Sequence, residues 1–409
     1  IVIRLNHEIN LEKRFTKSFF LVKGNNYILG EGRSSFIMKK RFLAMTMAAV
    51  LGLSLVGCGS SSTGAKAESK ADSGQTAAEG SGEAADSEGK SPIKVAVVYS
   101  GNLGDKSYND SCNAGAQQAA KDFGVEVKNL EGTTADEWEA NLLACCEGGY
   151  DLVICSNSNF QEYLEKYKDS YPDVKFAIID TTVKGPNVVS ISFAQNQGSF
   201  LAGAVAAMFT THSEIEGVND DAIIGWVGGQ DIPVLHDFYV GFEQGAKYIN
   251  PDITILQSYA GTWIDPLKGK ELTLAQYEQG ADIVMNVASG TGTGVLEAAK
   301  EAGKYAIGVD LNQDNDQPGH VVTSMVKRVD TACYSVIESV VEGNFKGDTT
   351  SYLEVSNDGV DLTDFAVIKE HLGDKFPADI QDKVQELKDK IISGEIVVNN
   401  YEGFGKDAQ

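Results

Sequence analysis

The chain contains few of the residues that usually hold metals, with only 6 cysteines and 5 histidines among 409 residues. No two cysteines have the Cys-x-x-Cys spacing of a metal or redox site, and the histidines are scattered, so a metal centre has little support. Basic side chains are also in the minority, 34 against 58 acidic ones, for a net charge of -24. Because nucleic acid is bound through a basic surface and none is visible, we do not expect nucleic acid as a partner. The cysteines other than Cys58 are Cys112, Cys145, Cys146, Cys155 and Cys333. We expect these five to be buried and to pack as small hydrophobic residues.

The chain also lacks an apolar run long enough to span a bilayer comfortably. The apolar stretch at residues 42–55 is short, follows the basic run Met38-Lys39-Lys40-Arg41 and ends in Leu55-Val56-Gly57-Cys58. That ending resembles the lipobox of bacterial lipoproteins, in which the cysteine is lipidated and becomes the first residue of the mature chain. We therefore expect a signal peptide at 38–57, lipidation at Cys58 and attachment to the extracytoplasmic face of the cell membrane through acyl chains. The alternative is an ordinary secretory signal with a chance cysteine.

Two segments near the start of the chain lack the composition of a folded core. Residues 1–37 have no useful apolar periodicity, and we expect them to be a translated leader outside the native protein. Residues 58–92, which include the lipidated cysteine, are mainly Ser, Gly, Ala, Glu, Asp and Lys. Such a composition cannot bury enough apolar surface to offset its ordering entropy, so this segment is expected to be a disordered linker.

From residue 93 onward, short apolar strands alternate with amphipathic helices. This alternation predicts an α/β fold with parallel, doubly wound sheets. Two such series indicate two Rossmann-like lobes, which we expect at 93–201 plus about 308–345 and at 202–307 plus about 346–409. The predicted strands lie at 94–98, 150–155, 174–180, 188–191, 222–227, 253–256, 282–287, 305–309 and 321–326.

Several of these strands end in loops that carry chemistry-bearing side chains. The first strand leads into the polar stretch 100–109, with a helix expected to begin near Asp110 and to end at Gly124. Ligands bind at such strand ends in open α/β sheets because backbone N–H groups and helix dipoles converge there. Each candidate also has a structural interpretation: a strand-end aspartate could cap a turn, Trp263 could be a core residue, and Lys327 could be solvated. The candidates for a shared site are Tyr108, Asn109, Asp180, Trp263, Gly290, Asp310 and Lys327.

A glycine-rich loop at 290–294 resembles part of a dinucleotide-binding fingerprint. Glycines permit close approach of the backbone to a ligand, and Asp310 lies twenty residues after Gly290, where a carboxylate can accept hydrogen bonds from ribose hydroxyls. The spacing is Gly-x-Gly-x-Gly, however, and no Gly-Lys-Ser/Thr sequence follows, which excludes a Walker loop. Ribose recognition without a pyrophosphate fits this loop better than NAD, and no cofactor is expected.

The loop after the first strand contains the motif Gly104-Asp105-Lys106-Ser107-Tyr108-Asn109, and further motifs lie at 198–203, 228–233, 241–245, 263–270, 280–282, 292–295 and 307–310. Together these motifs resemble the basic membrane protein (Bmp) family of substrate-binding lipoproteins, whose purine-nucleoside receptors serve ABC transporters. The resemblance implies a type I periplasmic-binding fold that closes on one nucleoside and delivers it to a permease and its ATPase. We expect such a protein to be a monomer.

The resemblance also assigns roles to the candidate residues. It implies that Tyr108 and Trp263 stack on the base, that Asp310 and Lys327 hold the ribose beside the Gly290 backbone, and that Asp180 and Asn109 face the base edge. Members of the family commonly have an aspartate nine residues before the aromatic residue of the signature. Here that position is Tyr99, so we treat it as a departure that bears on base preference.

Two other classes of function compete with a receptor. An enzyme acting on nucleosides or NAD would need a metal-binding aspartate cluster or a nucleophile with its base, and neither arrangement appears in the sequence. A surface sensor of a small ligand would use the same two-lobe fold and differ in its protein partner. We predict a non-catalytic receptor.

Overall fold

The structure is a computed structural model that describes residues 92–406. The expectations for 1–37, for the signal peptide at 38–57 and for the lipidated Cys58 and its linker up to residue 91 lie outside the described residues. Within 92–406, no helix is both long and apolar enough to cross a membrane.

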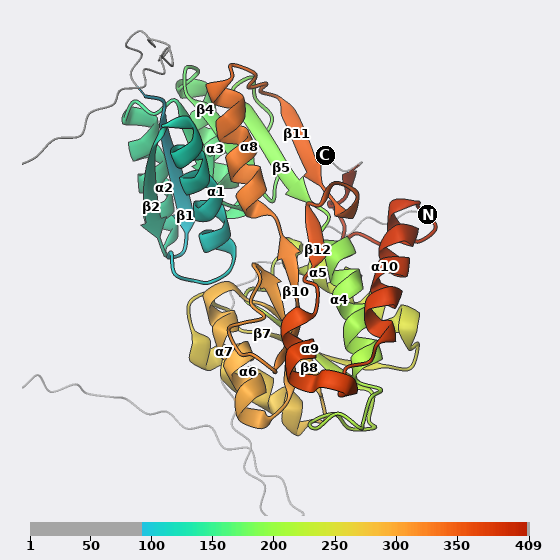
Figure 1. The fold of residues 1–409 in the computed structure, drawn as a ribbon. Coiled ribbons are helices and arrows are strands. Elements are labelled where there is room, and N and C mark those ends of the chain that lie inside the picture. The colour runs from blue at the N-terminus through green and yellow to red at the C-terminus, as the bar shows by residue number, and fades with distance from the viewer. Residues whose placement is uncertain (1–91, 407–409) are drawn as a thin grey trace, which may run out of the picture. The chain divides into compact units, whose positions relative to one another are not determined.

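The first lobe is built on a six-stranded parallel sheet in the order β11-β5-β4-β3-β1-β2. Its central strands are short runs of buried apolar residues, as expected for a parallel sheet covered on both faces. Figure 1 shows its helices around these strands. The elements of this lobe are β1 (Lys94–Ser100), α1 (Tyr108–Phe123), β2 (Glu126–Gly132), α2 (Ala135–Glu147), β3 (Leu152–Cys155), α3 (Gln161–Tyr167), β4 (Lys175–Ile179), β5 (Val188–Phe193), α8 (Val329–Val341) and β11 (Thr349–Leu353).

The second lobe contains a six-stranded sheet in the order β12-β10-β9-β8-β6-β7. Its strands pair in parallel except for β12, which runs antiparallel to β10. The elements of this lobe are α4 (Gln195–Phe209), β6 (Ile223–Gly228), α5 (Pro233–Ile249), β7 (Thr254–Tyr259), α6 (Pro266–Glu278), β8 (Ile283–Val287), α7 (Gly292–Ala302), β9 (Tyr305–Asp310), β10 (Val321–Lys327), β12 (Val360–Leu362), α9 (Ala366–Leu372) and α10 (Asp379–Ile392).

The structure confirms two doubly wound α/β lobes, but the predicted lobe boundaries near 201 and 308 are wrong. β9 and β10 extend the second sheet, and α4 packs on α5 and β10 of the second lobe from its first turn. The chain therefore crosses between lobes after β5, after β10 and after β11. Periodicity locates a strand but does not tell which sheet it joins, because pairing is set by contacts distant in sequence.

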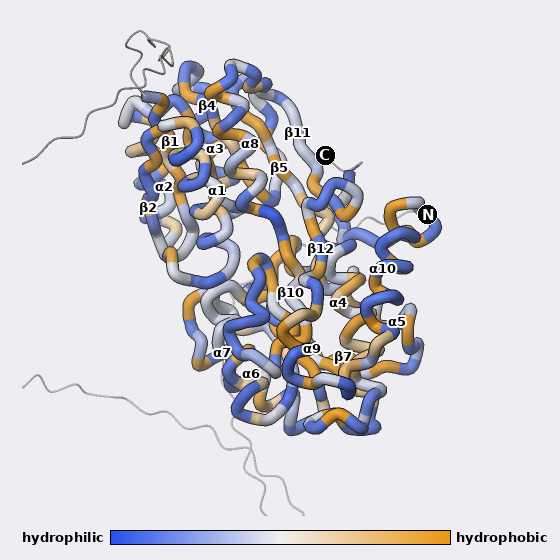
Figure 2. Tube along the Cα trace, viewed as in Figure 1, coloured by the Kyte–Doolittle hydropathy of each residue, from blue (hydrophilic) through white to orange (hydrophobic). Residues whose placement is uncertain are grey.

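Glycines of the family motifs bring α4 and α5 into close contact. A Cβ on Gly203 would lie 2.0 Å from the Phe242 carbonyl oxygen, and one on Gly245 would lie 1.9 Å from that of Phe200. Only glycine permits this approach, so these motif glycines are explained by helix packing rather than by ligand contact. Hydrophobic colouring follows α4 and the central strands, while the turns are mainly hydrophilic (Figure 2).

Candidate functional site

A pocket lies between the carboxyl ends of strands from both sheets, as the sequence predicted. From the first lobe it is lined by residues at or after the ends of β1, β3 and β4, and from the second lobe by residues at or after the ends of β6, β7, β8, β9 and β10. The space that it encloses, about 640 Å³, includes the part of its mouth that is open to solvent. The lining residues are Ser100, Tyr108, Asn109, Asn157, Ser158, Asn159, Asp180, Ile232, Val234, Leu235, Phe238, Trp263, Val287, Ser289, Asp310 and Lys327.

The loop between β1 and α1 is organised by Asp105, which the sequence did not single out. Its carboxylate accepts hydrogen bonds from the backbone N–H groups of Ser107, Asn109 and Asp110 at 3.0, 2.9 and 3.1 Å. Consequently α1 begins at Tyr108, not near Asp110 as expected, and Tyr108 and Asn109 lie in its first turn. The expected stop at Gly124 is confirmed, with a φ of 69° and its N–H donating to the Ala120 carbonyl.

The same loop bridges the two lobes. Ser107 Oγ donates to Asp310 Oδ2 at 2.5 Å, and Ser289 Oγ donates to Asp105 Oδ2 at 2.7 Å. Gln313 Nε2 donates to the Lys106 carbonyl at 2.9 Å. These bonds join groups beside the pocket in both lobes, which is how a two-lobe protein holds a closed conformation.

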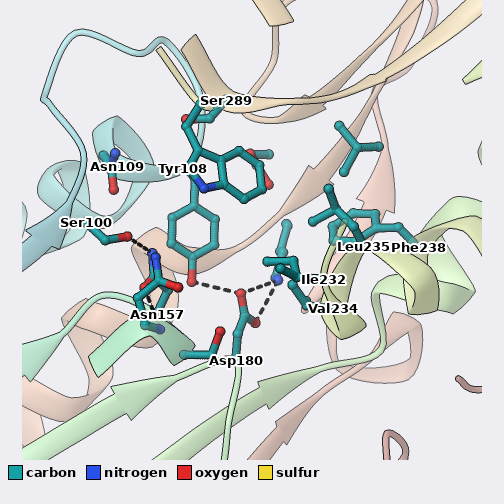
Figure 3. Close-up of a pocket in the computed structure, with 16 residues that line it drawn as sticks. Ser100, Tyr108, Asn109, Asn157, Asp180, Ile232, Val234, Leu235, Phe238 and Ser289 are labelled. Atoms are coloured by element: carbon teal, nitrogen blue, oxygen red, sulfur yellow. Dashed lines mark hydrogen bonds and ion pairs between the residues drawn. The ribbon is translucent and has the colours of Figure 1, made fainter. Parts of the chain in front are cut away.

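Tyr108, Asp180 and Lys327 form one buried cluster. Lys327 Nζ lies 2.7 and 2.8 Å from the two carboxylate oxygens of Asp180. The Tyr108 hydroxyl lies 2.9 Å from Asp180 Oδ2 and 2.7 Å from the Ser156 carbonyl, so its single proton serves one acceptor or the other. Figure 3 shows the Tyr108 hydroxyl directed at the Asp180 carboxylate. The resemblance assigned Lys327 to the ribose together with Asp310, and it assigned Asp180 to the base edge. In the structure, Lys327 pairs directly with Asp180.

Asp310 lies at the end of β9 and is 6% exposed. Its burial raises the pKa of this carboxyl to about 7, although the Ser107 hydroxyl and the Lys327 ammonium act in the opposite direction. Its backbone is in the left-handed region, with a φ of 64°, as are those of Asp180 at 63° and Ser289 at 51°. Non-glycine residues with such backbones are uncommon and concentrate at functional sites, where surrounding contacts hold them.

The two expected stacking residues come from opposite lobes and both line the pocket. A Cβ on Gly229 would lie 2.2 Å from the Trp263 ring, so the glycine makes room for the indole. Gly290 does not line the pocket. It lies beside the Trp263 backbone, while its neighbour Ser289 reaches the lining. Asn109 lines the pocket and donates through Nδ2 to the Asn102 carbonyl at 3.3 Å.

Tyr99 does not lie in the pocket, so the expectation that it replaces a ligand-facing acceptor is wrong. Its side chain is fully buried in the core, and its hydroxyl donates to Asn129 Oδ1 at 3.3 Å. Side chains on a strand alternate between faces, and the next residue, Ser100, lines the pocket instead. Ser100 Oγ accepts a hydrogen bond from Asn157 Nδ2, which Figure 3 also shows.

Two groups of lining residues were missed from the sequence. Asn157, Ser158 and Asn159 follow β3 directly, and a polar run at the end of a buried strand is a signal that could have identified them. The second group forms an apolar wall at the beginning of α5, where Phe238 also lies 5.2 Å from Lys327 Nζ measured to the ring centroid. This wall consists of Ile232, Val234, Leu235 and Phe238.

The pocket therefore combines aromatic and apolar side chains with amides, hydroxyls and carboxylates. This combination suits a flat, partly polar small molecule. In the part of the chain from 92 to 406, no cluster of three or more His, Cys, Asp or Glu side chains could hold a metal ion.

Two α/β lobes that enclose one pocket with the carboxyl ends of their strands define a solute-binding protein of the periplasmic type. The profile of the Bmp family, described as "ABC transporter substrate-binding protein PnrA-like", matches residues 93–402, and the chain belongs to this family. Its members are substrate-binding components that work with a permease and an ATPase.

The chain is similar in sequence to proteins of several bacteria and archaea. The chain is 30% identical to the "CD4+ T-cell-stimulating antigen" of Listeria innocua over 88% of this chain and 99% of that protein. It is also 30% identical to the "ABC transporter nucleoside-binding protein BmpA" of Lactococcus lactis, over 76% and 90% of the two chains. Relatives from Pyrococcus are named lipoproteins. The crystal structure of an ABC transporter solute-binding protein from Aeropyrum pernix aligns with a TM-score of 0.70 at 30% identity, covering 77% of this chain and 95% of that one.

Proposed function

We propose that this protein is the receptor of an ABC importer and that it binds a nucleoside, with purine nucleosides favoured, in the pocket between its lobes. The observation that carries the proposal is the pairing of two aromatic residues from opposite lobes, Tyr108 and Trp263, with a buried carboxylate at a strand end, Asp310. Aromatic rings bind the face of a base, and a carboxylate accepts hydrogen bonds from two ribose hydroxyls. The relative named as a nucleoside-binding protein supports the same ligand class.

The proposed mechanism uses the closure of the lobes. A ligand that contacts both lobes stabilises the closed form, because it binds that form more tightly than the open one. In the closed form, Ser107 and Ser289 join the lobes beside the ligand through Asp310 and Asp105. The permease then recognises the closed form and receives the nucleoside.

We further propose that the protein acts as a monomer at the extracytoplasmic face of the cell membrane, held there by a lipid on Cys58. The support is the Leu-Val-Gly-Cys ending at residues 55–58 together with the relatives named lipoproteins. The acyl chains would hold the receptor near its permease without a membrane-spanning helix.

A ligand screen tests the proposed function. Thermal unfolding is measured with inosine, guanosine, adenosine, uridine, ribose and NAD. A ligand at one hundred times its dissociation constant adds about 2.7 kcal/mol to the free energy of unfolding, which raises the melting temperature measurably. Stabilisation by purine nucleosides but not by ribose is expected, and the absence of stabilisation by every nucleoside would contradict the proposal.

A further inference from the structure

Two buried cysteines from segments far apart in sequence meet in the first lobe. Cys112 lies on α1 and Cys333 on α8, and their Sγ atoms are 2.8 Å apart. Both side chains are fully buried. The other cysteines of the described residues belong to a different cluster, on α2 and β3, so the first pair has no competing thiol at its own position.

Contacts along α1 and α8 fix the register in which these two cysteines meet. At one end, the Asp330 N–H donates to Ser111 Oγ at 3.2 Å, and a Cβ on Gly115 would lie 2.0 Å from the Asp330 carbonyl oxygen. At the other end, the rings of Phe123 and Tyr334 lie 5.3 Å apart between centroids. The close approach allowed by glycine and the contacts on both sides hold the two thiols opposite each other.

We propose that Cys112 and Cys333 form a disulfide that joins α1 to α8. The oxidant is a disulfide of a small molecule or of an extracytoplasmic thiol oxidase. One cysteine thiolate attacks the oxidant disulfide to form a mixed disulfide and releases one thiol. The second cysteine thiolate then attacks the mixed disulfide and releases the second thiol, so two thiols are oxidised and one disulfide is reduced.

This inference rests on the proposed extracytoplasmic location for its oxidant, since disulfides persist mainly in oxidising compartments. Burial raises the pKa of the Cys333 thiol, so the exchange takes place while the chain is folding and the thiols are still accessible. Cys112 lies one helical turn after Tyr108, and Cys333 follows Lys327 across the crossover from β10 to α8. The bond therefore anchors the helix that presents Tyr108 to the segment that returns from the second lobe.

The test is a count of thiols in the refolded chain. The full chain carrying Cys58→Ser is unfolded, reduced and refolded in glutathione with glutathione disulfide, then denatured and alkylated with or without reduction. Five cysteines remain in this variant, so we expect five alkylated cysteines after reduction. Without reduction we expect three, because the proposed disulfide protects the other two. Trypsin should release a linked pair of peptides, 107–121 with 329–346, that separates on reduction.

Matched variants distinguish this pair from other pairings. Cys155→Ala should keep the linked peptides, whereas Cys112→Ala should give four alkylated cysteines with and without reduction. Five alkylated cysteines in the unreduced chain, or a linked peptide that contains residues 129–166, would overturn the proposal. Ligand binding is not part of this readout, so a failure of the nucleoside assignment leaves the result unaffected.

Discussion

Replacing Lys327 with methionine should destabilise the protein strongly, because it leaves the Asp180 carboxylate buried without its cation. The two side chains are 1% and 6% exposed and meet at 2.7 Å. Methionine keeps most of the packing volume, so the effect isolates the lost charge. Removing one member of a buried ion pair costs about 3–5 kcal/mol, a large part of the roughly 5–15 kcal/mol that stabilises a domain.

Denaturant unfolding of the ligand-free protein measures this cost. Asp180→Asn in the Lys327→Met background should recover much of the loss, because it removes the unpaired charge. Lys106→Met is the matched surface control: this lysine is 61% exposed and lies 3.7 Å from Asp316, so its loss should cost about 0–1 kcal/mol. A cost below about 1 kcal/mol for Lys327→Met would refute the reasoning and would indicate that the pair is solvated without ligand.

Three further predictions concern the pocket. The pKa of Asp310 is about 7 in the folded protein and about 3.9 in the unfolded chain, so the free energy of unfolding should fall as the pH rises between these values. Urea unfolding of Asp310→Asn should lack that fall, and equal pH slopes of the free energy of unfolding in the two proteins would contradict the assignment. Trp263→Ala should weaken binding of every purine nucleoside by about 5- to 150-fold in calorimetry, from about 1–3 kcal/mol of stacking, and a base-selective loss would exclude pure stacking. Tyr108→Phe keeps the ring and removes only the hydroxyl bonded to Asp180, so nucleoside affinity should change less than 5-fold in the same assay, and a larger loss would show that the hydroxyl, not the ring, dominates.

Sequence reasoning succeeded where a strand is buried on both faces. Runs such as the one in β3 are continuous and apolar, and side chains at the carboxyl ends of parallel strands necessarily meet at one sheet edge. Asp180, Asp310 and Lys327 were found in this way. Sequence reasoning did not predict β2, whose residues are mostly exposed or partly exposed and include several polar ones. An edge strand of this kind has a weak pattern of apolar residues.

The misplacement of Tyr99 has a related cause. Every residue of β1 after Lys94 is buried, so the strand has no polar–apolar alternation from which the pocket-facing side chain could be read. A shift of one residue exchanges the two faces of a strand, and Ser100 takes the position that we assigned to Tyr99. Likewise, the start of α1 depended on the Asp105 carboxylate, whose hydrogen bonds are specific to the folded loop.

Calorimetry with guanosine and guanine, on the wild-type protein and on Asp310→Ala, tests the nucleoside assignment most directly. The account predicts that the variant loses guanosine affinity strongly and keeps its affinity for guanine, because Asp310 acts on the ribose alone. Ser107→Ala is the control that removes the hydrogen-bond partner of Asp310 and leaves its carboxylate in place. An equal loss for guanosine and guanine, or no binding of either to the wild-type protein, would contradict the account.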